Sequence, residues 1–224
     1  MNILWCITGA GQFLDRCYEA AKRLTLDNRV TVAFSTAGHE VCRMYGFLEK
    51  IEREFPEIVL EAEQGASSPL VGRLSRNEYD RVIVAPCTAN TAGKIVHGIA
   101  DSLVTNIVAQ AVKCKVPVYI LPTDAKKHQK TRVPISIDFA KCMQCDLCNA
   151  MENCLEGAFY VSDRVRIDLM KCRACKRCVD SCRHKAIEFG KVVDIECRDV
   201  DVRNAEILQG MGGIKVLGDI REIF

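Results

Sequence analysis

Residues 142–154 read C-M-Q-C-D-L-C-N-A-M-E-N-C, and residues 172–182 read C-R-A-C-K-R-C-V-D-S-C. Each stretch holds three cysteines separated by two residues and a fourth cysteine shortly afterwards. Three thiolates at this spacing can wrap one face of a cubane cluster while the loop amides point at its sulfur atoms. The two stretches hold eight of the chain's 14 cysteines, and they predict two [4Fe–4S] clusters.

The second stretch has the C-x2-C-x2-C-x3-C spacing of the bacterial ferredoxin run, in which the fourth cysteine ligates the other cluster. The predicted ligands of the first cluster are Cys142, Cys145, Cys148 and Cys182. Those of the second cluster are Cys172, Cys175, Cys178 and Cys154. The first stretch departs from the run, because its last step is two residues longer. Leu155 and Arg183 also stand where the run has proline.

Structural zinc ribbons are the alternative, since they also use C-x2-C pairs. Zinc would need only four ligands in two pairs, which leaves the third cysteine of each triplet unexplained. Matching tails follow the two fourth cysteines, Gly157-Ala158-Phe159 in one half and Lys185-Ala186-Ile187 in the other. This repeat is typical of the internal duplication of a ferredoxin. We therefore expect a small α+β ferredoxin domain of the bacterial type over residues 134–190.

Basic residues surround the second triplet, with Asp180 as the lone acid among them. They are Lys171, Arg173, Lys176, Arg177, Arg183 and Lys185. Such charges can offset the negative charge of a cluster and raise its potential, or form a docking face for an acidic electron carrier. A plain solvated surface is an equal alternative.

The whole chain has 224 residues, 49% of them hydrophobic, and a net charge of +2, which gives no global argument for nucleic acid or a membrane surface. The start of the chain lacks the basic region and cleavage site of a secretory signal. The apolar stretch 95–112 is interrupted by polar side chains such as Asp101. We expect a cytoplasmic protein with reduced thiols, and the cysteines outside the two stretches as small buried hydrophobes. These are Cys6, Cys17, Cys42, Cys87, Cys114 and Cys197.

Apolar runs alternate with helical patterns over residues 1–133, the first expected domain. The runs expected as strands are 3–8, 30–35, 58–61, 82–86 and 116–121. Between the first two runs, apolar residues recur at helical spacing. The predicted fold class is α/β, a Rossmann-like parallel sheet covered by helices on both faces.

Small polar residues gather where these strands end, which is where parallel sheets bind ligands. Gly9-Ala10-Gly11 makes a tight turn into a helix, Ser35-Thr36 ends the second strand, and Thr88-Ala89-Asn90-Thr91 follows the fourth. The first turn suits a phosphate, but a third glycine and an acid at the end of the second strand are missing for a dinucleotide. These loops predict an FMN site. The alternative is that the hydroxyl residues only cap helices.

The same residues carry a resemblance to the FMN-binding flavoproteins that include the phosphopantothenoylcysteine decarboxylases and the flavin prenyltransferases. It rests on Gly9-Ala10-Gly11, Ser35-Thr36, the A-P-C-T-A-N-T segment at 85–91 and G-I-A-D at 98–101, and it covers residues 1 to about 125. The catalytic histidine of the decarboxylases falls near Gly72 here, and their clamp motif is absent after the fifth strand. Decarboxylation is therefore disfavoured.

A flavoprotein domain followed by a two-cluster module resembles the archaeoflavoproteins and the acceptor-type dihydromethanopterin reductases with a fused ferredoxin module. The resemblance implies bound FMN, cytoplasmic location, homo-oligomeric assembly and reduction of 7,8-dihydromethanopterin, or its sarcinapterin form, with electrons from reduced ferredoxin. It gives no catalytic residue; His97 and Asp101 lie near the right loops, but a helical histidine is more often structural.

Two other functions stay open: an electron carrier between ferredoxin and partner proteins, and a non-redox flavoenzyme with structural clusters. Residues 191–224 are expected as a small C-terminal α/β extension without chemistry of its own, with a strand near 192–195, a short helix to Leu208 and an apolar run at 214–217.

Overall fold

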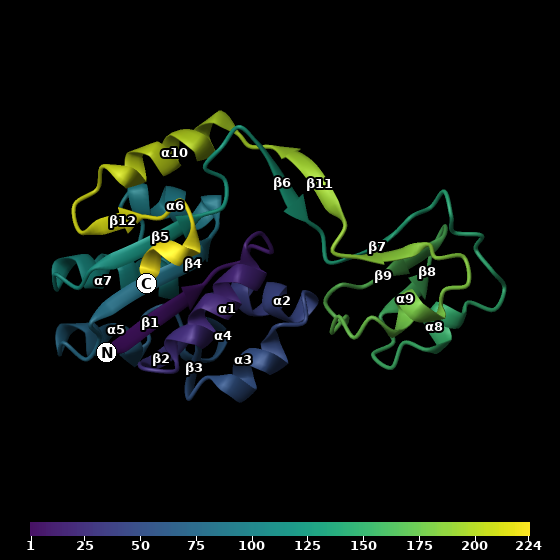
Figure 1. Cartoon of the computed structure of the whole chain (residues 1–224), viewed down its shortest axis with the longest axis horizontal. Coiled ribbons are helices and arrows are strands. Elements are labelled where there is room, and N and C mark those ends of the chain that lie inside the picture. The colour runs from purple at the N-terminus through teal and green to yellow at the C-terminus, as the bar shows by residue number, and fades with distance from the viewer.

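Six parallel strands form the central sheet of the computed structural model, which describes residues 1–224 (Figure 1). Their order across the sheet is β12-β5-β4-β1-β2-β3. They are β1 (Asn2–Ile7), β2 (Arg29–Phe34), β3 (Glu57–Leu60), β4 (Arg81–Cys87), β5 (Val118–Pro122) and β12 (Ile214–Val216). The five strands expected from the sequence are confirmed, and their nearly continuous burial is typical of a parallel sheet covered on both faces.

Helices cover both faces of this sheet and bury a separate hydrophobic cluster on each. One cluster holds Trp5, Leu14 and Phe34. The other holds Leu74, Val82, Val84 and Ile107. The helices are α1 (Leu14–Leu24), α2 (Thr36–Met44), α3 (Leu48–Glu54), α4 (Glu61–Gln64), α5 (Pro69–Ser75), α6 (Ala89–Val96) and α7 (Leu103–Lys113). The predicted α/β class is therefore confirmed.

The C-terminal residues complete this domain instead of forming an extension beside it. Strand β12 pairs with β5, and α10 (Asp199–Gln209) packs on α6 with Leu208 fully buried. The short 3-10 helix η1 (Ile220–Ile223) packs against α1. The expected strand, helix and apolar run all exist. The helix and the apolar run, now α10 and β12, belong to the sheet domain, whereas the strand near 192–195 pairs outside it.

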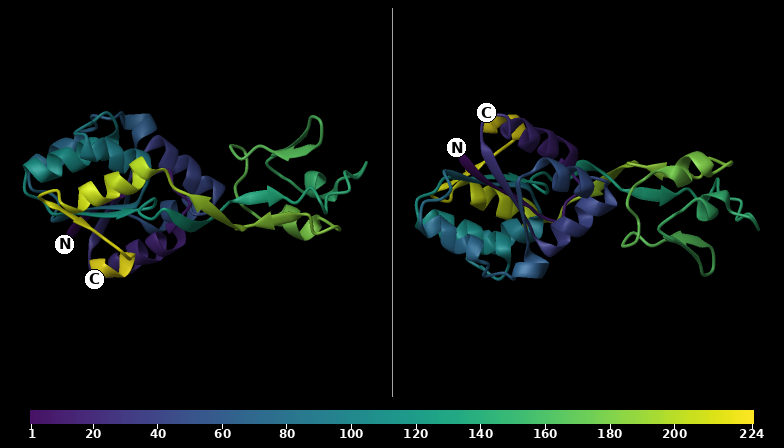
Figure 2. Two further views of the ribbon diagram at one scale, coloured as in Figure 1. Left: turned by 90° about the horizontal axis from the view of Figure 1, so that it is seen from above. Right: turned by 90° about the horizontal axis from the view of Figure 1, so that it is seen from below.

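A two-stranded arm leaves this domain after β5 and returns before α10. It consists of β6 (His128–Arg132) and β11 (Val192–Glu196), which pair in antiparallel fashion. Beyond the arm lies a small separate body that we call the cysteine module, residues 134–190, and both views of Figure 2 show it projecting from one end of the molecule. The module is thus an insertion into the sheet domain.

The cysteine module consists of two two-stranded antiparallel sheets and two short helices around a core of six buried residues. Strand β7 (Ile135–Ile137) pairs with β10 (Ile187–Phe189), and β8 (Phe159–Val161) pairs with β9 (Val165–Ile167). Helices α8 (Asn149–Glu152) and α9 (Arg177–Ser181) pack against each other.

The two halves of the module repeat the same backbone hydrogen bonds. Asp138 N–H donates to Ala186 O and Asp168 N–H donates to Ala158 O, each at 2.7 Å. The sulfur atoms of Cys154 and Cys182 each accept an N–H at 3.4 Å, from Ala158 and from Ala186. The repeat expected from the matching tails is present in the backbone.

Five of the six cysteines outside the two stretches are buried, as expected, while Cys114 is partly exposed. None of the helices combines the length and the apolar character needed to span a membrane.

Candidate functional site

The strand order places β1 beside β4, so the chain leaves these two neighbours in opposite directions along the sheet. Ligands of open parallel sheets bind at such a switch point. Thr8 ties the two strand ends together there: its hydroxyl donates to Pro86 O at 2.8 Å and accepts from Thr88 N–H at 2.8 Å. The loops predicted to bind FMN therefore converge on one edge of the sheet.

The first loop, Gly9-Ala10-Gly11, lies tightly against the start of α2. A Cβ atom on Gly9 would lie 2.7 Å from the Cβ of Ala37, so only glycine fits. No acceptor within the protein receives the backbone N–H groups of Gly9, Gly11 and Gln12. Unpaired amides before a helix are the donors that a phosphate group requires, so this loop fits the terminal phosphate of a flavin mononucleotide.

The second loop has its donors committed within the protein. Ser35 is the N-cap of α2 and accepts from Gly38 N–H at 3.0 Å. Thr36 donates its N–H and its hydroxyl to the Glu61 carboxylate, at 2.9 and 3.4 Å. The other oxygen of Glu61 accepts from Leu103 N–H at 2.6 Å. Glu61, directly after β3, therefore places an acid at this edge of the sheet. Its negative charge would repel a phosphate bound next to it.

The third loop combines capping with free polar groups. Thr88 is the N-cap of α6 and accepts from Thr91 N–H at 3.2 Å, and Thr91 is buried. Ala89 is half-buried and Asn90 is exposed, with a side-chain amide that makes no hydrogen bond in the protein. The capping alternative is confirmed for Ser35 and Thr88, and Asn90 remains free for a ligand.

A polar cluster that the sequence analysis missed lies between this edge and the arm. Asp124, just after β5, accepts from Gln129 at 3.4 Å and from the Cys197 thiol at 3.5 Å. Gln129 also donates to Cys197 Sγ at 3.1 Å, and Gln12 donates to Gln129 at 3.3 Å. Burial, followed by the nearby Asp124 charge, raises the pKa of Cys197. The sequence signal that could have identified Asp124 is its position directly after a strand of the parallel sheet, where such sheets bind ligands.

His97 and Asp101, the two candidate proton donors near the loops, lie between α6 and α7, and both are exposed. His97 is the exposed C-cap of α6, and Asp101 accepts from Lys94 at 2.7 Å. Neither side chain makes a hydrogen bond to the three loops.

The second predicted ligand set comes together in one small pocket. Cys154, Cys172, Cys175 and Cys178 all line it, together with apolar side chains such as Phe159 and Ile167. Burial raises the pKa of Cys178 to about 11, with further contributions from the Cys172, Cys175 and Cys154 thiols. Cys154 thus lies with the triplet of the other half of the cysteine module. Sulfur donors in an apolar pocket with loop amides turned toward them fit an iron–sulfur cluster.

Two members of the first predicted ligand set lie at the ends of the module's short helices. Cys148 caps the start of α8, Cys182 follows the end of α9, and these two helices pack together. No group of three or more Cys, His, Asp or Glu side chains has metal-coordinating geometry as it stands. The ligand assignments therefore remain predictions.

A cleft separates the cysteine module from the sheet domain. Its near wall is the loop after β1 and the turn between α2 and α3, and its far wall is the second cysteine loop and the end of β10. A Cβ on Gly46 would lie 3.1 Å from the Cβ of Ala174, and Arg173 forms an ion pair with Glu49 at 3.6 Å. The second cysteine group is thus the one that faces the sheet domain.

Comparison with known proteins gives the family. Residues 1–135 match the Flavoprotein family. Over 226 aligned residues the chain is 45% identical to a dihydromethanopterin reductase (acceptor) of Methanosarcina mazei, covering 96% of this chain and 94% of the relative. It is 40% identical to a protein of the same name from Methanocaldococcus jannaschii, covering 100% of this chain and 94% of the relative.

A solved structure shares the fold. DmrB of Burkholderia xenovorans, determined in complex with FMN and described as a cubic protein cage for redox transfer, superimposes with a TM-score of 0.63. It is 22% identical and covers 99% of this chain and 90% of that chain. Because residues 1–135 match the family model and two relatives with the same name align over nearly the whole chain, the chain belongs to the Flavoprotein family and is an oxidoreductase similar to the dihydromethanopterin reductases (acceptor).

Proposed function

We propose that this protein is an iron–sulfur flavoprotein that takes electrons from a low-potential donor such as reduced ferredoxin, carries them through two [4Fe–4S] clusters to FMN, and reduces 7,8-dihydromethanopterin or dihydrosarcinapterin to the tetrahydro form. The observation that carries the proposal is the insertion of the cysteine module directly beside the loop edge of a flavoprotein sheet. The near full-length similarity to two dihydromethanopterin reductases supports the substrate.

The proposed FMN contacts are the three loops at the sheet edge. The free amides of the first loop would hold the phosphate, and Asn90 would hydrogen-bond another part of the flavin. The proposed residues are Gly9, Ala10, Gly11, Ser35, Thr36, Thr88, Ala89, Asn90 and Thr91. When bound, a flavin accepts electrons singly and donates them as a hydride, which suits single-electron carriers upstream and a C=N bond downstream.

The proposed cluster ligands are the two crossed sets. The pocket that holds Cys154 together with Cys172, Cys175 and Cys178 supports the second set. The first set, Cys142, Cys145, Cys148 and Cys182, rests on the spacing and on the duplicated backbone. The proposal includes a cytoplasmic location and a homo-oligomer, both implied by the resemblance to the family.

The test is anoxic purification followed by mixing of the dithionite-reduced, desalted protein with 7,8-dihydromethanopterin and, separately, with 7,8-dihydrofolate. Reoxidation of the flavin absorbance with formation of a tetrahydropterin supports the reductase. Flavin that stays reduced with both compounds contradicts it.

The second candidate is an electron carrier without a small-molecule substrate. The basic residues around the second triplet favour it, since Lys171, Lys176 and Arg177 are exposed and suit an acidic protein partner. A carrier would reoxidise its flavin only when a partner protein is added, so the same mixing experiment separates the two functions.

A further inference from the structure

The cleft between the sheet domain and the cysteine module has a lining that selects a class of ligand. We infer that it binds a planar heteroaromatic ring with a negatively charged tail, and that Lys50 and Lys176 recognise the tail from opposite walls. The inference rests on the proposed function, in which a reduced pterin with an anionic side chain is such a ligand. Nothing in the proposed FMN or cluster contacts uses these two lysines.

Aromatic side chains stand on both walls. Phe13, Tyr45 and Phe47 come from the sheet domain, and Phe189 comes from the module. These are four of the chain's eight Phe and five Tyr residues, gathered at one place. All four are partly exposed in the cleft, which leaves ring surface for a flat ligand to stack on.

The charges of the cleft are almost all positive. Its lining includes Arg16, Lys50, Lys130, Arg132 and Lys176, against the single acid Asp15. The chain as a whole carries only +2, so the excess is local. Asp15 is already paired with Arg132 at 3.7 Å.

Lys50 and Lys176 are the two lysines of the cleft that pair with no carboxylate. The Lys50 ammonium lies 5.2 Å from the centre of the Phe47 ring, and that of Lys176 lies 4.5 Å from the Phe189 ring. The rings hold both ammonium groups at the walls while leaving their donors unused. An anionic tail would supply the missing acceptors.

Three of the chain's seven non-glycine residues with positive φ line the cleft: Phe13, Ala174 and Lys176. Phe13 and Lys176 adopt left-handed conformations, with φ of 63° and 64°, at the starts of α1 and α9, and neither helix has a side-chain cap. Asp146 occupies the position of Lys176 in the first half of the module, and its backbone is not left-handed. Such strain costs about 1–3 kcal/mol per residue and collects at ligand sites. Here it turns an aromatic and a basic side chain toward one space.

The cleft also adjoins the proposed flavin loop. Gly11 and Gln12 belong to that loop and line the cleft as well. A ligand bound here is therefore next to the residues that would hold FMN, as the substrate of a flavin reductase must be.

The test measures binding to the oxidised, FMN-loaded protein by calorimetry, with two probes. One is 7,8-dihydromethanopterin, whose side chain carries phosphate and carboxylate groups. The other is 6-hydroxymethyl-7,8-dihydropterin, which has the ring without an anionic tail. The double variant Lys50→Gln, Lys176→Gln should raise the Kd of the first probe about tenfold or more, because two charge-assisted contacts are lost. It should change the Kd of the second probe less than threefold.

The matched control is Lys126→Gln, Lys215→Gln, which removes two exposed lysines outside the cleft, one of them also beside an aromatic ring. It should change neither Kd. Phe189→Leu should weaken both probes, because the ring surface is shared. FMN content should stay at the wild-type level in every variant.

Two outcomes overturn the inference: no binding of the tailed probe by the wild type, or an equal Kd for that probe in the wild type and the Lys50, Lys176 double variant. A different outcome would overturn the reductase proposal alone. In that case the reduced protein binds the tailed probe with the predicted dependence on the two lysines but does not reduce it.

Discussion

At the scale of single residues, Gly38 shows how closely the sheet edge is built. It lies in the first turn of α2, where a Cβ atom would be 2.2 Å from the carbonyl oxygen of Ile7. That oxygen also accepts the N–H of Ser35 at 3.1 Å, so it cannot move without displacing the second loop. The fit of α2 against β1 therefore sets the geometry of the proposed FMN site.

We expect Gly38→Ala to lower the free energy of unfolding by about 1–3 kcal/mol, as overpacking does. It should also weaken FMN binding, because α2 and Ser35 must shift. Urea unfolding followed by the fluorescence of Trp5, the single tryptophan, buried in the sheet, measures the first effect. Titration of the apoprotein with FMN measures the second.

Gly72→Ala is the matched control, since a Cβ at Gly72 in α5 meets nothing within 4 Å. It should stabilise the protein by about 0.4–1 kcal/mol through the unfolded state. Equal stability of wild type and Gly38→Ala would contradict this account of the edge.

Residues whose role is local were predictable from the sequence, and residues whose partners are distant were not. Ser35 and Thr88 stand at strand ends before helices, and the structure has both there as N-caps. Glu61 reaches Thr36 across 25 positions, and Cys197 reaches Asp124 across 73. A spacing rule does not reveal such contacts, because the fold creates them.

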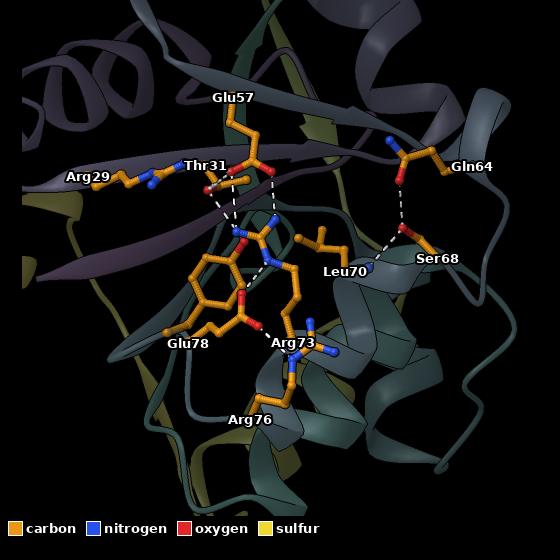
Figure 3. A network of polar contacts seen from close by, with 10 residues as sticks. Arg29, Thr31, Glu57, Gln64, Ser68, Leu70, Arg73, Arg76 and Glu78 are labelled. Carbon is orange, nitrogen blue, oxygen red and sulfur yellow. Dashed lines mark hydrogen bonds and ion pairs between the residues drawn. The ribbon is translucent and has the colours of Figure 1, made fainter.

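At the scale of elements, a network of ion pairs holds α5 against the edge of the sheet (Figure 3). Arg73 donates to both oxygens of Glu57, at 2.6 and 3.3 Å, and to Glu78 at 2.9 Å. Thr31 on β2 donates to Glu57 at 3.0 Å. The hydrogen bonds from Arg73 are the main cause that lowers the pKa of Glu57 below its ordinary value.

We expect Arg73→Met to cost about 1–2 kcal/mol of stability at pH 7, at the low end for charged hydrogen bonds because both side chains are about one quarter exposed. The folded pKa of Glu57 lies below its unfolded value of about 4.5. Its contribution is therefore fully present above that unfolded pKa and is lost as the pH falls through the folded one.

Urea unfolding of wild type and Arg73→Met at several pH values checks this prediction. The difference between them should shrink below about pH 4.5. Glu57→Gln should lose similar stability at pH 7. A difference that stays constant down to the acid limit of folding would show that Arg73 acts through packing alone.

The strands of the N-terminal sheet were predictable because each is a nearly continuous apolar run between helical patterns. The place of β12 was not, since three residues near the end of the chain carry no signal of their partner. Its pairing with β5 arises only once the chain has returned through the arm. The arm strands β6 and β11 alternate between exposed and half-buried residues, so their pattern is weak.

At the scale of the whole molecule, the structure is a sheet domain with a duplicated module inserted through a two-stranded arm (Figure 1). The duplication was predictable from the cysteine spacing and the matching tails. The orientation of the module was not, because it depends on the arm and on a few contacts such as Arg173 with Glu49. That orientation turns the second cysteine group toward the sheet domain.

The crossed ligand sets predict the iron content of paired variants. Cys154→Ser with Cys172→Ser affects one cluster only, so iron should fall from about eight to about four per chain. Cys154→Ser with Cys142→Ser affects both clusters and should leave almost none. Cys114→Ser, outside both sets, should keep the wild-type iron. If Cys154 instead served its own triplet, the results of the two double variants would be exchanged.

The central claim is that electrons enter through the cysteine module and leave at the flavin edge to a dihydropterin. Its most direct test is the rate of dihydromethanopterin reduction by FMN-loaded wild type and Cys175→Ser, driven either by reduced ferredoxin or by photoreduction of the flavin. The account predicts that Cys175→Ser loses most of the ferredoxin-driven rate and keeps the light-driven rate. Equal ferredoxin-driven rates in the two proteins would contradict it.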